Sequence, residues 1–319
     1  MKYVGIQSQI WNNNWKSVLL LIAFPVLVIG LVWVFFLIFN FWTIEEKQNF
    51  SVDSVNHSFI FTIPWVTIAV GIWFLIAWMS HSSIIRKATG AKTLERRDNK
   101  RVYNLTENLC ISQGMKMPKL YIINDNSLNA YASGLSERTF AVTLSKGIIN
   151  KLNDEELEAV IAHELTHIIN RDVRLLIISI VFVGIFAFVT EIAFRSLRFG
   201  GSSSGKKDNG GAAILIILAL GLIGLLLSSL FRFALSRKRE YLADAEAAEM
   251  TKRPWALASA LRKISEDPWI EAVKRDDVAQ MFIDHPTKEK NRKGLDSMLG
   301  SVFATHPPIK KRIEILEQF

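Results

Sequence analysis

The chain has 319 residues, of which 50% are hydrophobic and 21% are charged, and its formal net charge at pH 7 is +8. This mixture argues against a purely water-soluble protein and against one made only of membrane helices, so we expect apolar spans joined to a water-facing domain. No recognisable nucleic-acid-binding module accompanies the basic residues, so we expect no nucleic-acid partner. The lone Cys110 cannot form an internal disulfide, which fits a reducing compartment.

Four apolar runs are near the length of about 20 residues that crosses a hydrocarbon core as a helix. The first lacks a small-residue cleavage site, which predicts an anchor rather than a cleaved signal peptide. Polar residues interrupt the last two, namely Glu191 in one and Ser228 with Ser229 in the other, so helices half-buried in the protein or lying along the membrane surface are their alternative. The runs are 18–42, 59–79, 175–194 and 212–231.

The distribution of basic residues predicts the orientation in the membrane. Between the first two runs there is only Lys47, whereas the segment 86–101 after the second run is rich in lysine and arginine. The positive-inside rule places that second segment in the cytoplasm. The loop 195–211 also carries basic residues on what is then the far side, which partly violates the rule.

The water-facing segment begins after the second run. Its pattern predicts a helix over about 92–113, a strand at 119–124, and an alternating strand at 139–145 that forms a hairpin-like pair with the first strand. Between the strands, residues 124–138 are rich in Asn, Ser and Gly and are predicted to be a loop.

After the strand at 139–145, Asn153 is followed by three acids. This pattern predicts a capped helix that runs from Asn153 to about Asn170. The glycine- and serine-rich stretch within 195–211 predicts a flexible linker. Ile309, Ile313 and Leu316 suit an amphipathic closing helix. We expect four parts along the chain. Residues 1–79 are an N-terminal region with two transmembrane helices, and residues 80–174 are the first half of a water-facing domain. Residues 175–233 are two hydrophobic helical segments, and residues 234–319 are the second half of that domain.

The pattern His163-Glu164-x-x-His167 falls on the helix that Asn153 begins. Histidines four residues apart lie on one helical face, one turn apart, so both imidazoles can bind a single metal ion. Zinc bound in this way needs a third protein ligand and keeps an open position for water, whose pKa the ion lowers. Glu164 is adjacent and suits the general base toward that water. The alternative is two histidines on a helix face with a solvated glutamate.

A third ligand is expected in "SRKREYLADAEAAE", because two membrane crossings or none separate this segment from His167 and return it to the same side. Glu240 and Asp244 lie four residues apart there, which suits Glu240 as a metal ligand and Asp244 as the acceptor of an imidazole N–H. Glu246 and Glu249 compete for the ligand position, and a charged surface helix is the alternative.

Four motifs occur in order along the chain: "NAYASG" at 129–134, "AHELTHIINRD" at 162–172, "SRKREYLADAEA" at 236–247 and "THPPIKKRI" at 305–313. With them the chain resembles, over most of its length, the HtpX-like membrane zinc metalloproteases, relatives of the prenyl-protein CAAX endopeptidases. The resemblance implies a gluzincin-like core, one Zn²⁺ per chain on His163, His167 and Glu240, Glu164 as catalytic base and Asp244 as support. It also implies quality control of membrane proteins and a stress response.

Two further positions follow from the resemblance. Asn129 precedes the strand at 139–145, predicted to be an edge strand that borders the cleft, where a substrate peptide can pair as an added strand; an ordinary turn asparagine is the alternative. His306 is like the family's second-half histidine and could donate to the oxyanion that forms during attack, with a helix-capping role as the alternative.

The sequence therefore predicts a mostly helical α+β integral membrane protein with transmembrane helices and a gluzincin-like zinc metalloprotease domain that has a small β-sheet. The expected activity is endopeptidase cleavage of membrane or membrane-associated proteins, in the bilayer of a bacterial cytoplasmic (inner) membrane, with the active site facing the cytoplasm. A prenyl-protein or signal-type processing protease and a non-catalytic zinc-binding membrane scaffold are the alternatives.

Overall fold

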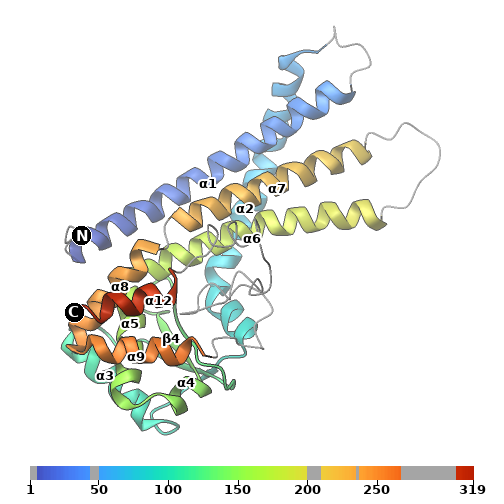
Figure 1. The fold of residues 1–319 in the computed structure, drawn as a ribbon. Helices are drawn as coiled ribbons and strands as arrows, with labels where there is room; N and C mark the ends of the chain where they lie inside the picture. Colours follow the sequence, from blue (N-terminus) through green and yellow to red (C-terminus); the bar gives the residue numbers. More distant parts are fainter. Residues whose placement is uncertain (1–5, 44–49, 200–209, 235–236, 267–306) are drawn as a thin grey trace. The chain divides into compact units, whose positions relative to one another are not determined.

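The computed structural model describes residues 6–43, 50–199, 210–234, 237–266 and 307–319, and Figure 1 labels their helices. The chain forms two compact units. The helical unit comprises Lys16–Met79 and Ile178–Phe231, and the sheet-containing unit comprises Met1–Trp15, Ser80–Ile177 and Arg232–Phe319. The sheet-containing unit is therefore assembled from segments that are far apart in the sequence.

Within the described residues, the helical unit is supplied by long apolar helices. Three of them are long and apolar enough to cross a membrane, over Asn14–Thr43, Val52–Thr89 and Asp172–Arg198, and these include the first three predicted runs. The fourth run lies in a helix whose described apolar portion, Gly211–Leu227, is shorter. The helices are α1 (Ile6–Thr43), α2 (Val52–Thr89), α6 (Asp172–Phe199) and α7 (Gly210–Ala234).

Aromatic rings and small residues set the packing inside the helical unit. Phe24 of α1 stacks on Phe182 of α6 with ring centroids 3.9 Å apart. The ring of Phe186 lies where a larger side chain at Gly224 of α7 would have to go, so α6 and α7 approach closely at this glycine. Trp33 of α1 donates a hydrogen bond of 3.1 Å to the Asn56 side chain of α2, which joins the first two helices.

The predicted linker at 195–211 is wrong at its first end. Residues 195–199 continue α6, and Arg195 supports the helix there by pairing at 2.6 Å with Glu191 one turn earlier. At the other end, residues 210 and 211 begin α7. The part of the linker at 200–209 lies outside the described residues.

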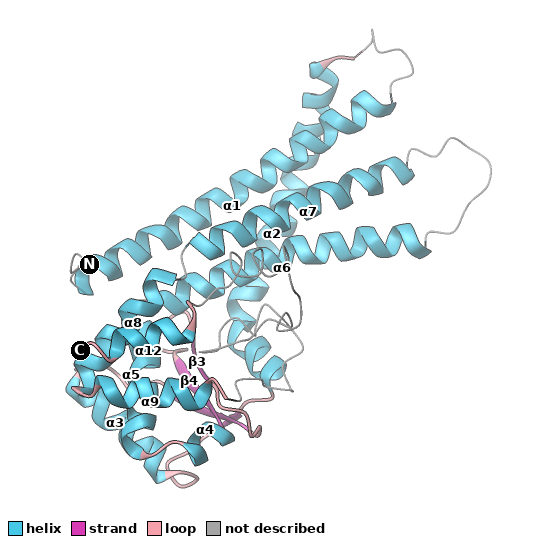
Figure 2. Cartoon of the chain, in the orientation of Figure 1, coloured by secondary structure: helices cyan, strands magenta, loops and turns pink. Residues whose placement is uncertain are grey.

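The sheet-containing unit combines a small mixed sheet with several helices, and Figure 2 separates the two by colour. The strands are β1 (Lys92–Thr93), β2 (Lys119–Ile123), β3 (Ala130–Ser133) and β4 (Ala141–Ser145). The helices are α3 (Lys100–Ser112), α4 (Lys146–Lys151), α5 (Asp154–Ile169), α8 (Arg237–Thr251), α9 (Pro254–Ile264) and α12 (Ile309–Leu316). This architecture confirms the mostly helical α+β fold with a small sheet.

The strand order is β1-β2-β4-β3, and it corrects three predictions. The supposed loop at 124–138 contains β3, whose residues are all buried. The strands at 119–124 and 139–145 do not form a hairpin: β2 and β4 pair in parallel, because the chain first crosses over to form β3. The strand at 139–145 is also not an edge strand, since β4 lies between β2 and β3.

The helix predicted over 92–113 begins later, at Lys100. Asn99 caps it by accepting a hydrogen bond of 3.0 Å from the Val102 amide, which fixes the first turn at this position. Upstream, Lys92 and Thr93 pair with β2 as the short strand β1 instead of joining the helix.

Helix α5 is the central element of the sheet-containing unit. It packs against α8, α9 and α3 and against β3, and most of its length is buried. Its start is fixed by Asn153, whose side chain accepts from the Glu156 amide at 2.9 Å while the Glu156 carboxylate accepts from the Asn153 amide at 3.0 Å. Glu156 also binds Lys263 of α9 at 2.7 Å, which ties the cap to the neighbouring helix.

Candidate metal centre

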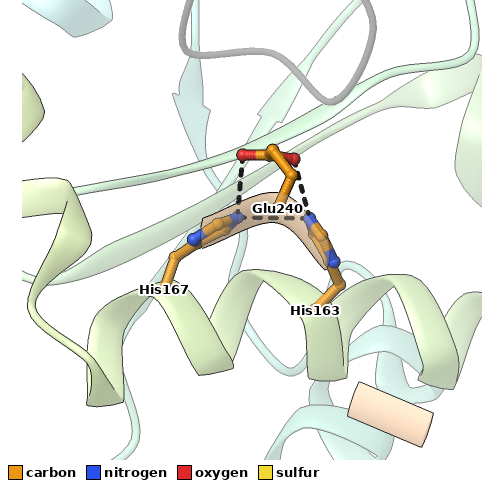
Figure 3. A group of neighbouring side chains, drawn as sticks. All are labelled: His163, His167 and Glu240. Atoms are coloured by element: carbon orange, nitrogen blue, oxygen red, sulfur yellow. Dashed lines mark hydrogen bonds and ion pairs between the residues drawn. The ribbon is translucent and has the colours of Figure 1, made fainter. Parts of the chain in front are cut away.

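His163 and His167 lie one turn apart on α5 and turn their imidazoles toward each other, as Figure 3 shows. Their Nε2 atoms are 3.2 Å apart. The rings meet edge to face at an interplanar angle of 90°. Because α5 is held at its cap and buried along its length, the two nitrogen atoms converge on one point.

Glu240 reaches the same point from α8, as the sequence predicts for the third ligand. Its Oε2 lies 3.7 Å from Nε2 of His163, and its Oε1 lies 3.6 Å from Nε2 of His167. The three candidate ligand atoms all lie within 4.8 Å of one another. Glu240 comes from a segment more than seventy residues downstream, so α5 and α8 must pack together before the group exists (Figure 3).

The tautomers of the two histidines indicate what the group can bind. Nδ1 of His163 lies 3.1 Å from Oδ1 of Asp244, and Nδ1 of His167 lies 3.2 Å from Oδ2 of Asp172. An ionised carboxylate only accepts hydrogen bonds, so each Nδ1 carries a proton and each Nε2 faces the centre, where it offers a lone pair when the imidazole is neutral. Two imidazole Nε2 atoms facing each other beside the Glu240 carboxylate form a site for a cation.

These distances also fit zinc in particular. Ligands bound tetrahedrally to Zn²⁺ at about 2.0–2.1 Å lie about 3.4 Å from one another. The observed separations of 3.2, 3.6 and 3.7 Å scatter around that value. Two imidazoles and one carboxylate are a three-ligand set that zinc enzymes use when a fourth position stays open for water. The residues present therefore fit zinc.

Arg312 of α12 is a site residue that the sequence interpretation missed. It is 1% exposed, and it donates to Oδ2 of Asp244 through Nε at 2.8 Å and to Oδ1 through Nη2 at 2.7 Å. Its Nη1 lies 3.6 Å from Oε2 of Glu240. The Arg312 guanidinium therefore fixes the Asp244 carboxylate, which orients His163, and it neutralises negative charge beside Glu240, the candidate third ligand.

Asp172 is the second missed residue, and it orients His167 much as Asp244 orients His163. Its Oδ1 lies 3.6 Å from Nη1 of Arg239, the residue directly before Glu240 on α8. The Nδ1 atom of each histidine therefore contacts a carboxylate, and each of these carboxylates lies beside an arginine side chain. In the sequence, Asp172 closes the motif "HELTHIINRD", but a residue five positions beyond the second histidine has no face-sharing spacing that would mark it.

The charges around the site shift the pKa values of its members. Burial lowers the pKa of His163, but the carboxylates of Asp244 and Glu240 outweigh this effect and raise it to about 9, so a metal ion that binds Nε2 of His163 displaces a proton. Burial raises the pKa of Asp244, but Arg312 outweighs it and keeps the value below the ordinary one. Asp244 is therefore ionised and accepts a hydrogen bond from Nδ1 of His163.

Glu164 is 2% exposed and directly follows the candidate ligand His163 on α5. Burial raises its pKa, against the lowering effects of the two histidines and of a hydrogen bond from the Ala132 amide. Ala132 belongs to β3, the edge strand of the sheet. A buried carboxyl with a raised pKa is suited to take up and release a proton near neutral pH.

The remaining predicted site residues have different outcomes. Asn129 is 1% exposed, and its side chain accepts from the Ala130 amide at 3.0 Å, so it shapes the entry to β3 from inside the fold. β3, and not the strand at 139–145, is the terminal strand at this side of the sheet. His306 lies outside the described residues. Glu246 accepts a hydrogen bond from Asn170 instead of facing the histidines.

A buried and a partly buried histidine one turn apart, a glutamate from a second helix and a buried carboxyl beside the first histidine define the class of metallopeptidases with the H-E-x-x-H pattern. The family model for peptidase family M48 matches residues 96–319, and the chain belongs to this family. It is a membrane metalloendopeptidase of mostly helical α+β fold.

Two relatives agree with this membership. The chain is 59% identical over 324 residues to a protease HtpX homolog of Bacteroides fragilis, with 100% of both chains covered. It is 40% identical over 257 residues to a protease HtpX homolog of Listeria monocytogenes, covering 77% of this chain and 82% of the relative. Among solved structures, S. mikatae Ste24p is similar at 22% identity with a TM-score of 0.45, covering 97% of this chain and 66% of that chain.

Proposed function

We propose that the chain is a zinc endopeptidase that binds one Zn²⁺ through His163, His167 and Glu240 and uses Glu164 as its general base. The observation that carries the proposal is the convergence of two Nε2 atoms and a carboxylate on one point, with Glu164 directly beside the first histidine. Bound zinc supplies a Lewis acid that lowers the pKa of a water molecule and polarises the scissile carbonyl.

The chain's own residues carry the remaining steps. Glu164 accepts the proton of the attacking water and passes it to the departing amine, for which its raised pKa suits it. Asp244 and Asp172 hold the imidazoles of His163 and His167 in the tautomer that faces the centre. The outer edge of β3 receives the substrate backbone as an added strand, and Asn129 shapes the start of β3. His306 is proposed to donate to the oxyanion.

The proposed substrates are membrane or membrane-associated proteins, cut at the cytoplasmic face of a bacterial inner membrane as part of quality control under stress. Three helices of sufficient length and apolarity support the membrane placement. Basic residues after the second run support the orientation. The relatives named as protease HtpX homologs support the substrate class of proteins. The proposed organisation keeps the four-part division 1–79, 80–174, 175–233 and 234–319.

Replacing Glu164 by glutamine tests the catalytic proposal directly. We expect the Glu164→Gln protein to retain zinc and to lose at least about 100-fold in casein cleavage, because glutamine keeps the shape of the side chain and removes the base. Glu155→Gln, which changes an exposed acid on the same helix, is the matched control and keeps activity. Full activity in Glu164→Gln would overturn the assignment of the base, and cleavage unaffected by a chelator would favour a zinc-binding scaffold.

A further inference from the structure

A basic cavity lies on the sheet-containing unit at the edge of the sheet opposite to the one beside the metal centre. It has a volume of about 600 Å³ and is lined by β1, β2, α3 and the last turn of α2. The strand order β1-β2-β4-β3 places this cavity at the β1–β2 edge, whereas Glu164 meets the sheet at β3. The cavity is therefore separate from the candidate active site.

Its charge is positive and only partly neutralised. Arg86, Arg96 and Lys119 line the cavity together with one acid, Glu95. Glu95 is already paired with Arg97 at 2.9 Å, and Arg96 lies 3.4 Å from Glu107. Within the described part of the chain, no acidic side chain forms an ion pair with Arg86 or Lys119. Two cations are thus available to an anion in this cavity.

Aromatic rings hold the two arginines in place. The guanidinium of Arg86 lies 5.4 Å from the ring centroid of Tyr121, and that of Arg96 lies 5.4 Å from the ring centroid of Tyr103. Such cation–π contacts orient a guanidinium. Arg86 also donates from Nε to the Ser82 carbonyl and from Nη2 to the Ser83 hydroxyl, each at 3.3 Å, and its remaining N–H groups are able to donate to an anion. Planar donor groups flanking a cavity of this size suit a phosphate with attached substituents better than a bare ion.

The position of Arg86 along α2 indicates where the phosphate comes from. The second apolar run ends at Met79, and α2 continues without a break to Thr89. Arg86 follows Met79 by seven residues, which is roughly 10 Å of helix and corresponds to the depth at which lipid headgroups follow the hydrocarbon core. Lys87, Lys92 and Arg97 add positive charge next to the cavity in the sequence.

We propose that this cavity binds the headgroup of an anionic phospholipid, with Arg86 and Lys119 on the phosphodiester and Arg96 beside them. The proposal rests on α2 crossing the bilayer, as proposed above, and it does not depend on the metal centre. The lipid holds the sheet-containing unit at the membrane surface through a defined site, in addition to the general attraction of the basic segment.

The test compares lipid binding by purified full-length protein in detergent, with phosphatidylglycerol and phosphatidylcholine titrated separately and bound lipid counted by native mass spectrometry. Removing one cation near a lipid surface weakens binding about fivefold. We therefore expect Arg86→Gln and Lys119→Gln each to weaken phosphatidylglycerol binding about fivefold, and the double variant about 25-fold. Lys151→Gln, an exposed lysine on α4, is the matched control and changes binding less than twofold.

Three results would overturn the proposal. One is equal phosphatidylglycerol binding by the double variant and by Lys151→Gln. The second is equal binding of phosphatidylglycerol and phosphatidylcholine by the unaltered protein. The third is displacement of the lipid by inorganic phosphate at the same concentration, which would show a site for free phosphate. Casein cleavage by the double variant in detergent verifies folding, and Glu164→Gln, which should bind lipid like the unaltered protein, separates this proposal from the catalytic one.

Discussion

Arg312 gives the most demanding test of how the metal centre is held, because its charge is buried and has a specific partner. In Arg312→Gln, Asp244 loses two hydrogen bonds of 2.8 and 2.7 Å and stays in the interior, where it is 2% exposed. Removing one partner of a buried ion pair costs about 3–5 kcal/mol. For a unit of this size, we expect the midpoint of thermal unfolding to fall by about 6–20 °C.

The comparison variant is Arg253→Gln, which changes an arginine that is 40% exposed and pairs with Glu158 at 3.0 Å. A surface pair of this kind contributes about 0–1 kcal/mol, so the midpoint should fall by less than about 4 °C. Unfolding is followed in the presence of a chelator, so that a change in zinc affinity does not contribute to the difference between variants.

A double variant tests whether Arg312 acts through Asp244. If Arg312 acts through Asp244, then Asp244→Asn combined with Arg312→Gln removes both charges and costs clearly less than the sum of the single changes. Two results would refute the view that the buried Arg312–Asp244 pair organises the site. One is a loss of stability in the double variant equal to the sum of the single losses. The other is an unfolding midpoint for Arg312→Gln that falls no further than that of Arg253→Gln.

Three further outcomes follow from other parts of the sheet-containing unit. Asp172→Asn should weaken zinc binding about 10–100-fold in a chelator competition, because it removes the carboxylate behind His167, whereas the exposed Asp154→Asn should leave it unchanged. Hydrogen bonds from Lys263, Ser259 and the Asn153 amide outweigh burial, which alone would raise the pKa of Glu156, and hold it below its ordinary value of 4.5. The charge of Glu156 therefore stabilises the fold above pH 4.5. The stability that Glu156→Gln loses at pH 7 should vanish as the pH falls through the lowered pKa. A difference in stability between the two proteins that does not change with pH would contradict this. Gly134→Ala should lower the unfolding midpoint, because Gly134 has φ +115° and an added Cβ would lie 2.5 Å from the Thr139 carbonyl oxygen; an unchanged midpoint would show that the turn before β4 can relax.

Local signals predicted the catalytic helix well. Asn153 and the acids after it predicted a helix to about Asn170, and α5 runs over Asp154–Ile169 with the expected capping box. The spacing of His163 and His167 then fixed their common face, because helical periodicity depends only on neighbours in the sequence. The placement of Glu240 followed from its spacing with Asp244 and from the family resemblance.

The sheet was less predictable, because strand pairing is decided by residues that are distant in the sequence. The segment that forms β3, "AYAS", is short and buried throughout, so it shows no alternation of polar and apolar residues. Its flanking Asn, Ser and Gly residues favoured a loop. Once β3 is inserted beside β4, the strand at 119–123 must pair with β4 in parallel, and the hairpin expected from proximity in the sequence is lost.

The helical spacing of Arg312 in the sequence already indicated that its side chain is buried. In the closing helix it lies three residues after Ile309 and four before Leu316, so helical spacing places it on the apolar face that those residues define. A basic residue in "IKKRIEIL" is ordinarily assigned to solvent, and only the buried Asp244 from α8 explains why this one faces inward.

The most direct test of the metal centre is the amount of zinc bound per chain in the unaltered protein, in Glu240→Ala and in Glu246→Ala, each purified in the same way and measured by elemental mass spectrometry. The arrangement of His163, His167 and Glu240 predicts one zinc ion in the unaltered protein and in Glu246→Ala, and far less than one in Glu240→Ala. Stoichiometric zinc in Glu240→Ala, or its loss only in Glu246→Ala, would contradict the assignment.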